Sequence, residues 1–120
     1  LRAYRNPLSN LPDSIGNLVK LRELHLDQTL LTSLPETLEN LKDLRVLSVR
    51  GCRLVSLPTS IEGLTQLRQL DLRANQLKEL PDALASLPRL EKLDLRWNHE
   101  LTRFPRWLES LEERGCLVYR

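Results

Sequence analysis

The sequence is poor in several residue types on which particular functions depend. Its 120 residues include two cysteines, four glycines, two tryptophans, two tyrosines, one phenylalanine and no methionine. Two cysteines cannot form a disulfide framework, and the few glycines form no phosphate-binding loop. No apolar run approaches the roughly 18 residues of a membrane-spanning helix. A net charge of +2 is too small to indicate nucleic-acid binding by itself.

Leucine, by contrast, is abundant. It accounts for 31 of the 120 residues, within a hydrophobic content of 41%. A core built largely from one side chain indicates one kind of packing site that is used many times. The length of the chain fits a single domain with a modest core.

The leucines recur with a period of 23 residues. Position 1 of successive units is taken by Leu21, Leu44, Leu67 and Leu90. Apolar residues then fall at positions 1, 4, 6, 11, 14, 18 and 21, and proline falls at position 15. The first unit is partial and the fifth slips by one residue from Leu101 onward. We assign residues 1–111 to five repeats and residues 112–120 to a C-terminal capping strand.

The two ends of the array depart from the regular unit. After a turn at Gly115, we place Leu117 and Tyr119 at the inward positions 4 and 6 of a last half-unit. This register puts Val118 and Arg120 at the outward positions 5 and 7. No capping segment covers Leu1, so we expect an N-terminal cap or a further domain to precede it.

Each unit predicts a strand followed by a short helix. The segment from position 4 to position 6 alternates with period two, which is typical of a strand with leucine pointing inward. Proline at position 15 suits the first residue of a helix, and the apolar spacing of three that follows fits one α-helical or 3-10 turn. One such unit cannot bury its own leucines, so the units must stack in parallel and share a core.

Position 9 is expected to turn the chain inward. It holds Asn6, Thr29, Cys52, Asn75 and Asn98. A side chain there can satisfy backbone groups left unpaired at the turn, and asparagine does so better than threonine or cysteine.

The complete pattern, LxxLxLxxNxLxxLPxxLxxL, resembles the leucine-rich repeat family in its bacterial-type 23-residue form. The resemblance implies an α/β solenoid with a curved parallel β-sheet on its concave side and short helical or 3-10 turns on its convex side. It covers nearly the whole chain and is specific for the fold, whereas it says little about biochemical activity.

The outward strand side chains, at positions 2, 3, 5, 7 and 8, are predicted to line this concave face. Stacking converts each position into a column of side chains across the repeats. The candidate partner-binding residues on the concave face are Tyr4, His25, Asp27, Arg50, Asp71, Arg73, Asp94, Arg96 and Trp97.

Two readings of the charged columns remain open. Asp71 and Asp94 neighbour Arg50, Arg73 and Arg96. These residues either neutralise one another, with about 0–1 kcal/mol for each exposed pair, or present arginines to the carboxylates of a protein partner.

The two tryptophans also have alternative explanations. Trp97 has the composition of a binding hot spot, or it packs over Arg73 or Arg120, or it covers the last repeat at the C-terminal end. For Trp107, on the convex side, we favour coverage of the end of the array.

The remaining reactive residues form no predicted catalytic, metal or cofactor site. His25 and His99 lie at different repeat positions and do not converge on one point. Cys52 and Cys116 are nearly three repeats apart, on the order of 14 Å across neighbouring strands, which is beyond disulfide reach. We therefore expect two free thiols and no enzyme activity.

The sequence predicts a protein-interaction module that binds a protein partner on its concave face. The resemblance implies the recognition domain of a larger protein, such as a bacterial effector or an intracellular scaffold, located in the cytoplasm or secreted into a host cell. One alternative is the substrate-recognition part of an enzyme, such as a ubiquitin ligase or kinase, whose catalytic domain lies outside this chain. The other is nucleic-acid or phosphate binding through the arginine columns, against which the interleaved aspartates argue. No small-molecule substrate or membrane contact is predicted.

Overall fold

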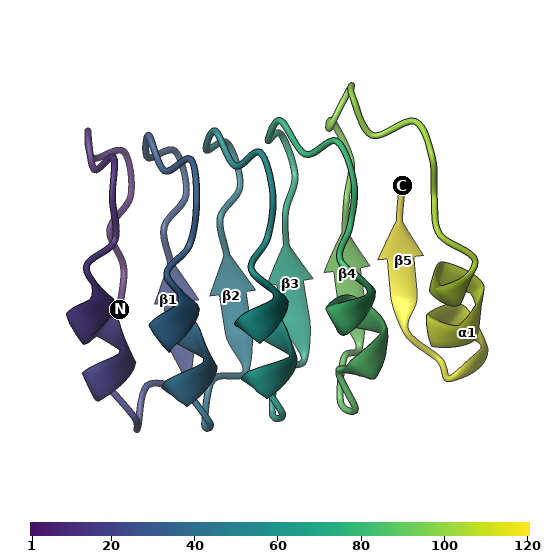
Figure 1. Ribbon diagram of the computed structural model, residues 1–120, viewed down its shortest axis with the longest axis horizontal. Helices are drawn as coiled ribbons and strands as arrows, with labels where there is room; N and C mark the ends of the chain where they lie inside the picture. The colour runs from purple at the N-terminus through teal and green to yellow at the C-terminus, as the bar shows by residue number, and fades with distance from the viewer.

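The computed structural model describes all 120 residues as one stack of similar layers (Figure 1). Each layer pairs a three-residue strand with a short helix. The elements run in the order η1 (Asp13–Asn17), β1 (Glu23–His25), η2 (Glu36–Asn40), β2 (Val46–Ser48), η3 (Thr59–Gly63), β3 (Gln69–Asp71), η4 (Asp82–Ser86), β4 (Lys92–Asp94), α1 (Trp107–Glu113) and β5 (Leu117–Tyr119). No helix combines the length and hydrophobicity needed to cross a membrane.

The five strands form one open parallel sheet in the order β1-β2-β3-β4-β5. Leu24, Leu47 and Leu70 are direct partners in neighbouring strands, 23 residues apart in each case. The first repeat adds only an isolated bridge between Arg2 and His25. The helices lie in a second layer on the other side of the core (Figure 1). The predicted α/β solenoid is confirmed.

The core lies between the sheet and the helices and consists almost entirely of leucine. It contains 29 buried hydrophobic residues. Most predicted inward positions are buried; Leu47, Leu54 and Leu64, for example, are each 0% exposed. Leu1, Leu18 and Phe104, near the two ends of the array, are however 54%, 46% and 39% exposed. Repeats two to four contribute equivalent sets of side chains, so the core is continuous along the stack.

The prolines at position 15 do not begin the helices as predicted. In η1 to η4 the proline is the residue before the helix, with extended backbone; Pro58, for example, has φ −70° and ψ 148°. Its carbonyl accepts the first helical hydrogen bond, from the Ile61 amide at 3.2 Å. Proline therefore fixes the entry of the chain into the helix from one place earlier than expected.

The register of the last strand also differs from the prediction. Lys92 pairs with Leu117, 25 residues later, whereas Gln69 pairs with Lys92 at the regular 23. Leu117 and Tyr119 consequently point outward, with exposures of 58% and 37%. Val118 faces the core instead of the solvent.

The cause of the shift is the end of the α1 helix. Here a full α-helix replaces the five-residue 3-10 helix of the other repeats. It ends with Gly115 at φ +94°, where the Gly115 amide donates to the Glu112 carbonyl and the Cys116 amide donates to the Leu111 carbonyl. This Schellman turn takes up a residue that the regular repeat lacks.

The C-terminal end is further held by contacts between layers. Trp107 donates its indole N–H to the Asp82 carboxylate at 3.1 Å, so it ties α1 to η4. Arg120 does not join the column of Arg96. It donates to Glu112 at 2.5 Å, and its guanidinium lies 5.7 Å from the Phe104 ring centroid.

Candidate functional site on the concave face

The strand register builds the columns of the concave face. His25, Ser48, Asp71 and Asp94 are aligned at position 5 of successive strands. Two residues after each of them comes the position 7 column, which contains Asp27, Arg50, Arg73 and Arg96. The predicted residues of the four central repeats are therefore brought onto one surface.

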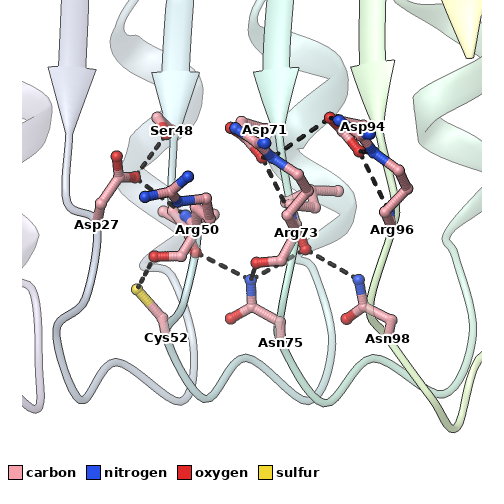
Figure 2. Close-up of polar contacts among 12 residues, drawn as sticks. Asp27, Ser48, Arg50, Cys52, Asp71, Arg73, Asn75, Asp94, Arg96 and Asn98 are labelled. Atoms are coloured by element: carbon pink, nitrogen blue, oxygen red, sulfur yellow. Dashed lines mark hydrogen bonds and ion pairs between the residues drawn. The ribbon is translucent and has the colours of Figure 1, made fainter. Parts of the chain in front are cut away.

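In the fourth and fifth repeats, aspartate and arginine side chains form an ion-pair network (Figure 2). Arg73 binds Asp71 through Nε at 3.0 Å and through Nη2 at 2.6 Å. Arg96 binds Asp94 in the same way, at 3.0 and 2.7 Å. Arg73 also reaches across to Asp94, with 3.3 Å between Nε and Oδ2. We call Asp71, Arg73, Asp94 and Arg96 the ion ladder.

The ion ladder is most deeply embedded at Asp94, which is only 1% exposed. Burial raises the pKa of this carboxyl group, but hydrogen bonds from the Arg96 side chain and amide outweigh it, and the pKa lies below its ordinary value. The side-chain hydrogen bond to Asp94 raises the pKa of Arg96. The hydrogen bond to Asp71 raises the pKa of Arg73. These geometries favour mutual neutralisation within the ion ladder.

The neighbouring repeat on the N-terminal side is arranged differently. Ser48 replaces aspartate at position 5, and its hydroxyl donates to Asp27 Oδ1 of the preceding repeat at 2.5 Å. The same oxygen accepts from the Arg50 amide at 3.0 Å. No carboxylate lies within ion-pair distance of the Arg50 guanidinium. Arg50 is thus the one arginine of this column that lacks an acidic partner.

Two hollows open on this part of the surface. One, of about 410 Å³, is lined by Tyr4, Arg5, Asp27, Gln28 and Arg50. The other, of about 160 Å³, lies over the strands and includes Ser48 in its lining. A partner side chain can therefore enter the concave face beside Arg50.

The N-terminal end of the concave face carries a small aromatic and polar cluster. The His25 ring nitrogen lies 2.9 Å from Glu23 Oε1, and the Tyr4 ring meets the His25 ring edge-on at 6.1 Å between centroids. The hydrogen bond with His25 lowers the pKa of Glu23. His25 contacts Glu23 rather than Asp27, its neighbour in sequence.

The C-terminal end presents a larger aromatic surface. Trp97 is 57% exposed, with the guanidinium carbons of Arg73 and Arg96 at 6.0 and 5.7 Å from its ring centroid. Arg96 also lies 5.0 Å from the ring centroid of Tyr119. The predicted packing of Trp97 over Arg73 is present, while most of the indole stays open to solvent. Tyr119 was missed because the predicted register turned it inward.

Position 8 is a left-handed turn rather than the outward strand position that we predicted. The φ values of Arg5, Gln28, Gly51, Ala74 and Trp97 range from +52° to +71°. This region favours glycine, and the single glycine of the column, Gly51, was the available signal in the sequence. The turn swings Trp97 out beside the strand ends, where it meets the arginines.

The other reactive residues lie apart from these features. No group of three or more His, Cys, Asp and Glu side chains is arranged to hold a metal ion. Cys52 and Cys116 are free and buried, and burial raises the pKa of the Cys116 thiol. Cys116 lies just before β5.

Comparison with known proteins gives the same picture along the whole chain. Residues 5–117 match the family described as leucine-rich repeat region. A leucine-rich-repeat protein of Leptospira interrogans superposes with a TM-score of 0.88 and 33% identity, covering 100% of this chain and 30% of the other. The leucine-rich-repeat ectodomain of the receptor kinase SOBIR1 from Arabidopsis thaliana gives 0.78 and 26%, covering 99% and 67%. No curated protein matches the sequence significantly.

Proposed function

Because the chain belongs to the leucine-rich repeat family, we propose that it is a protein-interaction module that binds a protein partner on its concave face. The fold is commonly used for binding and typically carries no catalytic chemistry. The proposal therefore assigns recognition, and no reaction, to these residues.

The observation that carries the proposal is the exposed Trp97 beside two arginines. Tryptophan, tyrosine and arginine dominate the energetics of protein interfaces. Trp97 is held in place by Arg73 and Arg96, so little conformational freedom is lost when a partner covers it. Tyr119 extends the same surface.

The predicted site residues take two roles in this proposal. Those in direct contact with the partner are Tyr4, His25, Asp27, Arg50 and Trp97. The ion ladder (Asp71, Arg73, Asp94 and Arg96) fixes the shape of the surface, and its two arginines lie beside the Trp97 ring. Because two of the three column arginines already have acidic partners, the geometry does not favour nucleic acid.

The proposal extends to a larger protein. The chain spans 30% of its Leptospira relative, which supports a recognition segment within a longer protein of bacterial origin. An effector secreted into a host cell is one such protein. The similarity to a receptor-kinase ectodomain favours a second arrangement, in which these repeats select the substrate or ligand of an enzyme whose catalytic domain lies elsewhere. Determining the full-length gene product tests both.

Peptide selection tests the binding function itself. Random linear peptides displayed on phage are selected on the immobilised protein, and the binding surface of a selected peptide is mapped by NMR chemical-shift changes. Trp97→Ala should weaken peptide binding by at least about tenfold. Val55→Ala, a smaller apolar truncation at a 46% exposed side chain in the segment between β2 and η3, should not. Peptides that map to the convex side, or that bind Trp97→Ala unchanged, contradict the proposal.

A further inference from the structure

Arg50 lies one repeat before the ion ladder and does not take part in it. At position 7, Arg50, Arg73 and Arg96 occupy equivalent places in three consecutive repeats. Arg73 and Arg96 are each bound through two nitrogens by the aspartate two residues before them. For Arg50 that residue is Ser48, whose side chain is too short and carries no charge.

Asp27 makes only one of the two kinds of contact that an aspartate at position 48 would make with Arg50. Its Oδ1 accepts the Arg50 amide at 3.0 Å, as Asp71 does for the Arg73 amide at 3.1 Å. It forms no ion pair with the guanidinium, and the contact drawn between Asp27 and Arg50 in Figure 2 is the one to the amide. The backbone turn is therefore satisfied, while the cationic end of Arg50 remains available.

We propose that Arg50 binds a carboxylate side chain, aspartate or glutamate, of the protein partner, in the hollow lined by Tyr4, Arg5, Asp27, Gln28 and Arg50. This inference rests on the proposed protein-binding function and names the chemistry that the partner supplies. The partner's carboxylate takes the place that Asp71 and Asp94 occupy beside their own arginines.

The charges around the hollow suit an acidic group. Its lining contains two arginines and one aspartate, so it has a net positive charge. Arg5 is oriented by its Nε, which donates to Gln28 Oε1 at 2.8 Å. Asp27 is engaged through one oxygen by Ser48 and the Arg50 amide, and Tyr4, 43% exposed, forms an aromatic wall. A planar guanidinium favours a bidentate carboxylate.

The test uses the same phage-displayed random peptides, selected on the wild-type protein, with dissociation constants measured for the selected sequences. The concave-face binders should be enriched in aspartate and glutamate, and Arg50→Gln should weaken them at least about tenfold. Arg53→Gln is the matched control, because Arg53 is exposed and lies outside the hollow. It should leave the affinity unchanged.

A swap variant tests the missing-carboxylate explanation without changing composition or net charge. Asp27→Ser combined with Ser48→Asp moves the acidic group to the place that Asp71 has in its repeat. Arg50 then gains an internal partner, and acidic peptides should lose at least about tenfold in affinity. A melting temperature close to that of the wild type shows that the swap folds.

The outcomes separate this inference from the broader function. Concave-face binders without an acidic excess overturn the carboxylate assignment and leave protein binding intact. Acidic binders that are retained by Arg50→Gln overturn it as well. Failure to select any concave-face binder counts against the proposed function, and the assignment of Arg50 fails with it.

Discussion

The two halves of the array share one backbone design but differ in how their polar side chains are used. We call the turn at position 9 the inner turn and the concave face the outer surface. In the C-terminal half, the inner turn contains Asn75 and Asn98, and the charged side chains of the outer surface are paired in the ion ladder. In the N-terminal half, Thr29 and Cys52 stand at the inner turn, and Arg50 on the outer surface has no acidic partner. The charged side chains of a repeated fold can therefore be paired with one another in one half and left partly unpaired in the other.

The inner turn shows the difference most clearly. Asn75 accepts the Leu54 amide at 3.0 Å and donates to the Val49 and Leu72 carbonyls at 2.9 and 3.1 Å. Cys52 makes weaker sulfur contacts, at 3.2 Å with the Leu26 carbonyl and with Thr29 Oγ1 and at 3.9 Å with the Arg50 carbonyl. The buried Leu31 amide, equivalent to that of Leu54, has no acceptor. The N-terminal half therefore carries an uncompensated buried donor.

The largest contrast should come from truncating the two inner turns. Asn75→Ala should lower the free energy of unfolding by roughly 2–4 kcal/mol, because several buried backbone groups lose their partner at about 1–3 kcal/mol each. Cys52→Ala, which removes only weak sulfur contacts, should cost about 1 kcal/mol. Urea denaturation measures both, and equal losses would show that the inner turns do not differ.

On the outer surface, Asp94→Asn tests the ion ladder. It should destabilise the protein by about 1–3 kcal/mol near neutral pH, because Arg73 and Arg96 lose a charged acceptor. The folded-state pKa of Asp94 is depressed, so its contribution is present above the ordinary value of about 4 and is lost as the pH falls through the folded-state pKa. Urea denaturation across this range should show the two proteins converging in acid, and a pH-independent difference would refute the ionic origin.

A substitution that repairs the weaker inner turn should raise the free energy of unfolding instead of lowering it. Cys52→Asn offers a carbonyl oxygen to the Leu31 amide, as Asn75 does for Leu54, and should raise the free energy of unfolding by about 1 kcal/mol. Thermal melting is sufficient to detect it. A lower melting temperature would indicate that the contact between Thr29 and Cys52, 3.2 Å from Oγ1 to Sγ, is the better arrangement.

The smallest expected effect on stability concerns Ser60, on the convex side of the third repeat. Ser60 is 7% exposed and its hydroxyl has no hydrogen-bond partner, and Ala83 occupies the same position in the next repeat. Ser60→Ala should leave stability unchanged or raise it by up to about 1 kcal/mol. A clear loss, measured by calorimetry, would mean that the hydroxyl is bonded in solution.

Much of this arrangement was predictable because a 23-residue period fixes which residues share a column. The strands, the inward leucines and the roles of Asn75 and Asn98 followed from it. The register of the last strand could not be predicted in this way, because the Schellman turn at Gly115 adds a residue that no regular repeat contains. Tyr119 was misplaced for that reason.

The candidate site was predictable as a set of residues but not as a set of bonds. Column positions placed aspartates beside arginines, yet they could not show that Ser48 turns to Asp27 and leaves Arg50 unpaired. That outcome depends on side-chain length and rotamer within one repeat. The left-handed turn that exposes Trp97 was marked in the sequence only by Gly51.

The central claim, that the ion ladder is structural and Arg50 is free, is tested most directly by one comparison of unfolding free energies. Arg73→Gln and Arg50→Gln remove the same charge at equivalent places in neighbouring repeats. The structure predicts a loss of about 1–3 kcal/mol for Arg73→Gln, which breaks the hydrogen bonds to Asp71 and the ion pair with Asp94. It predicts a change within about 0.5 kcal/mol for Arg50→Gln. Equal losses for the two variants would contradict the account.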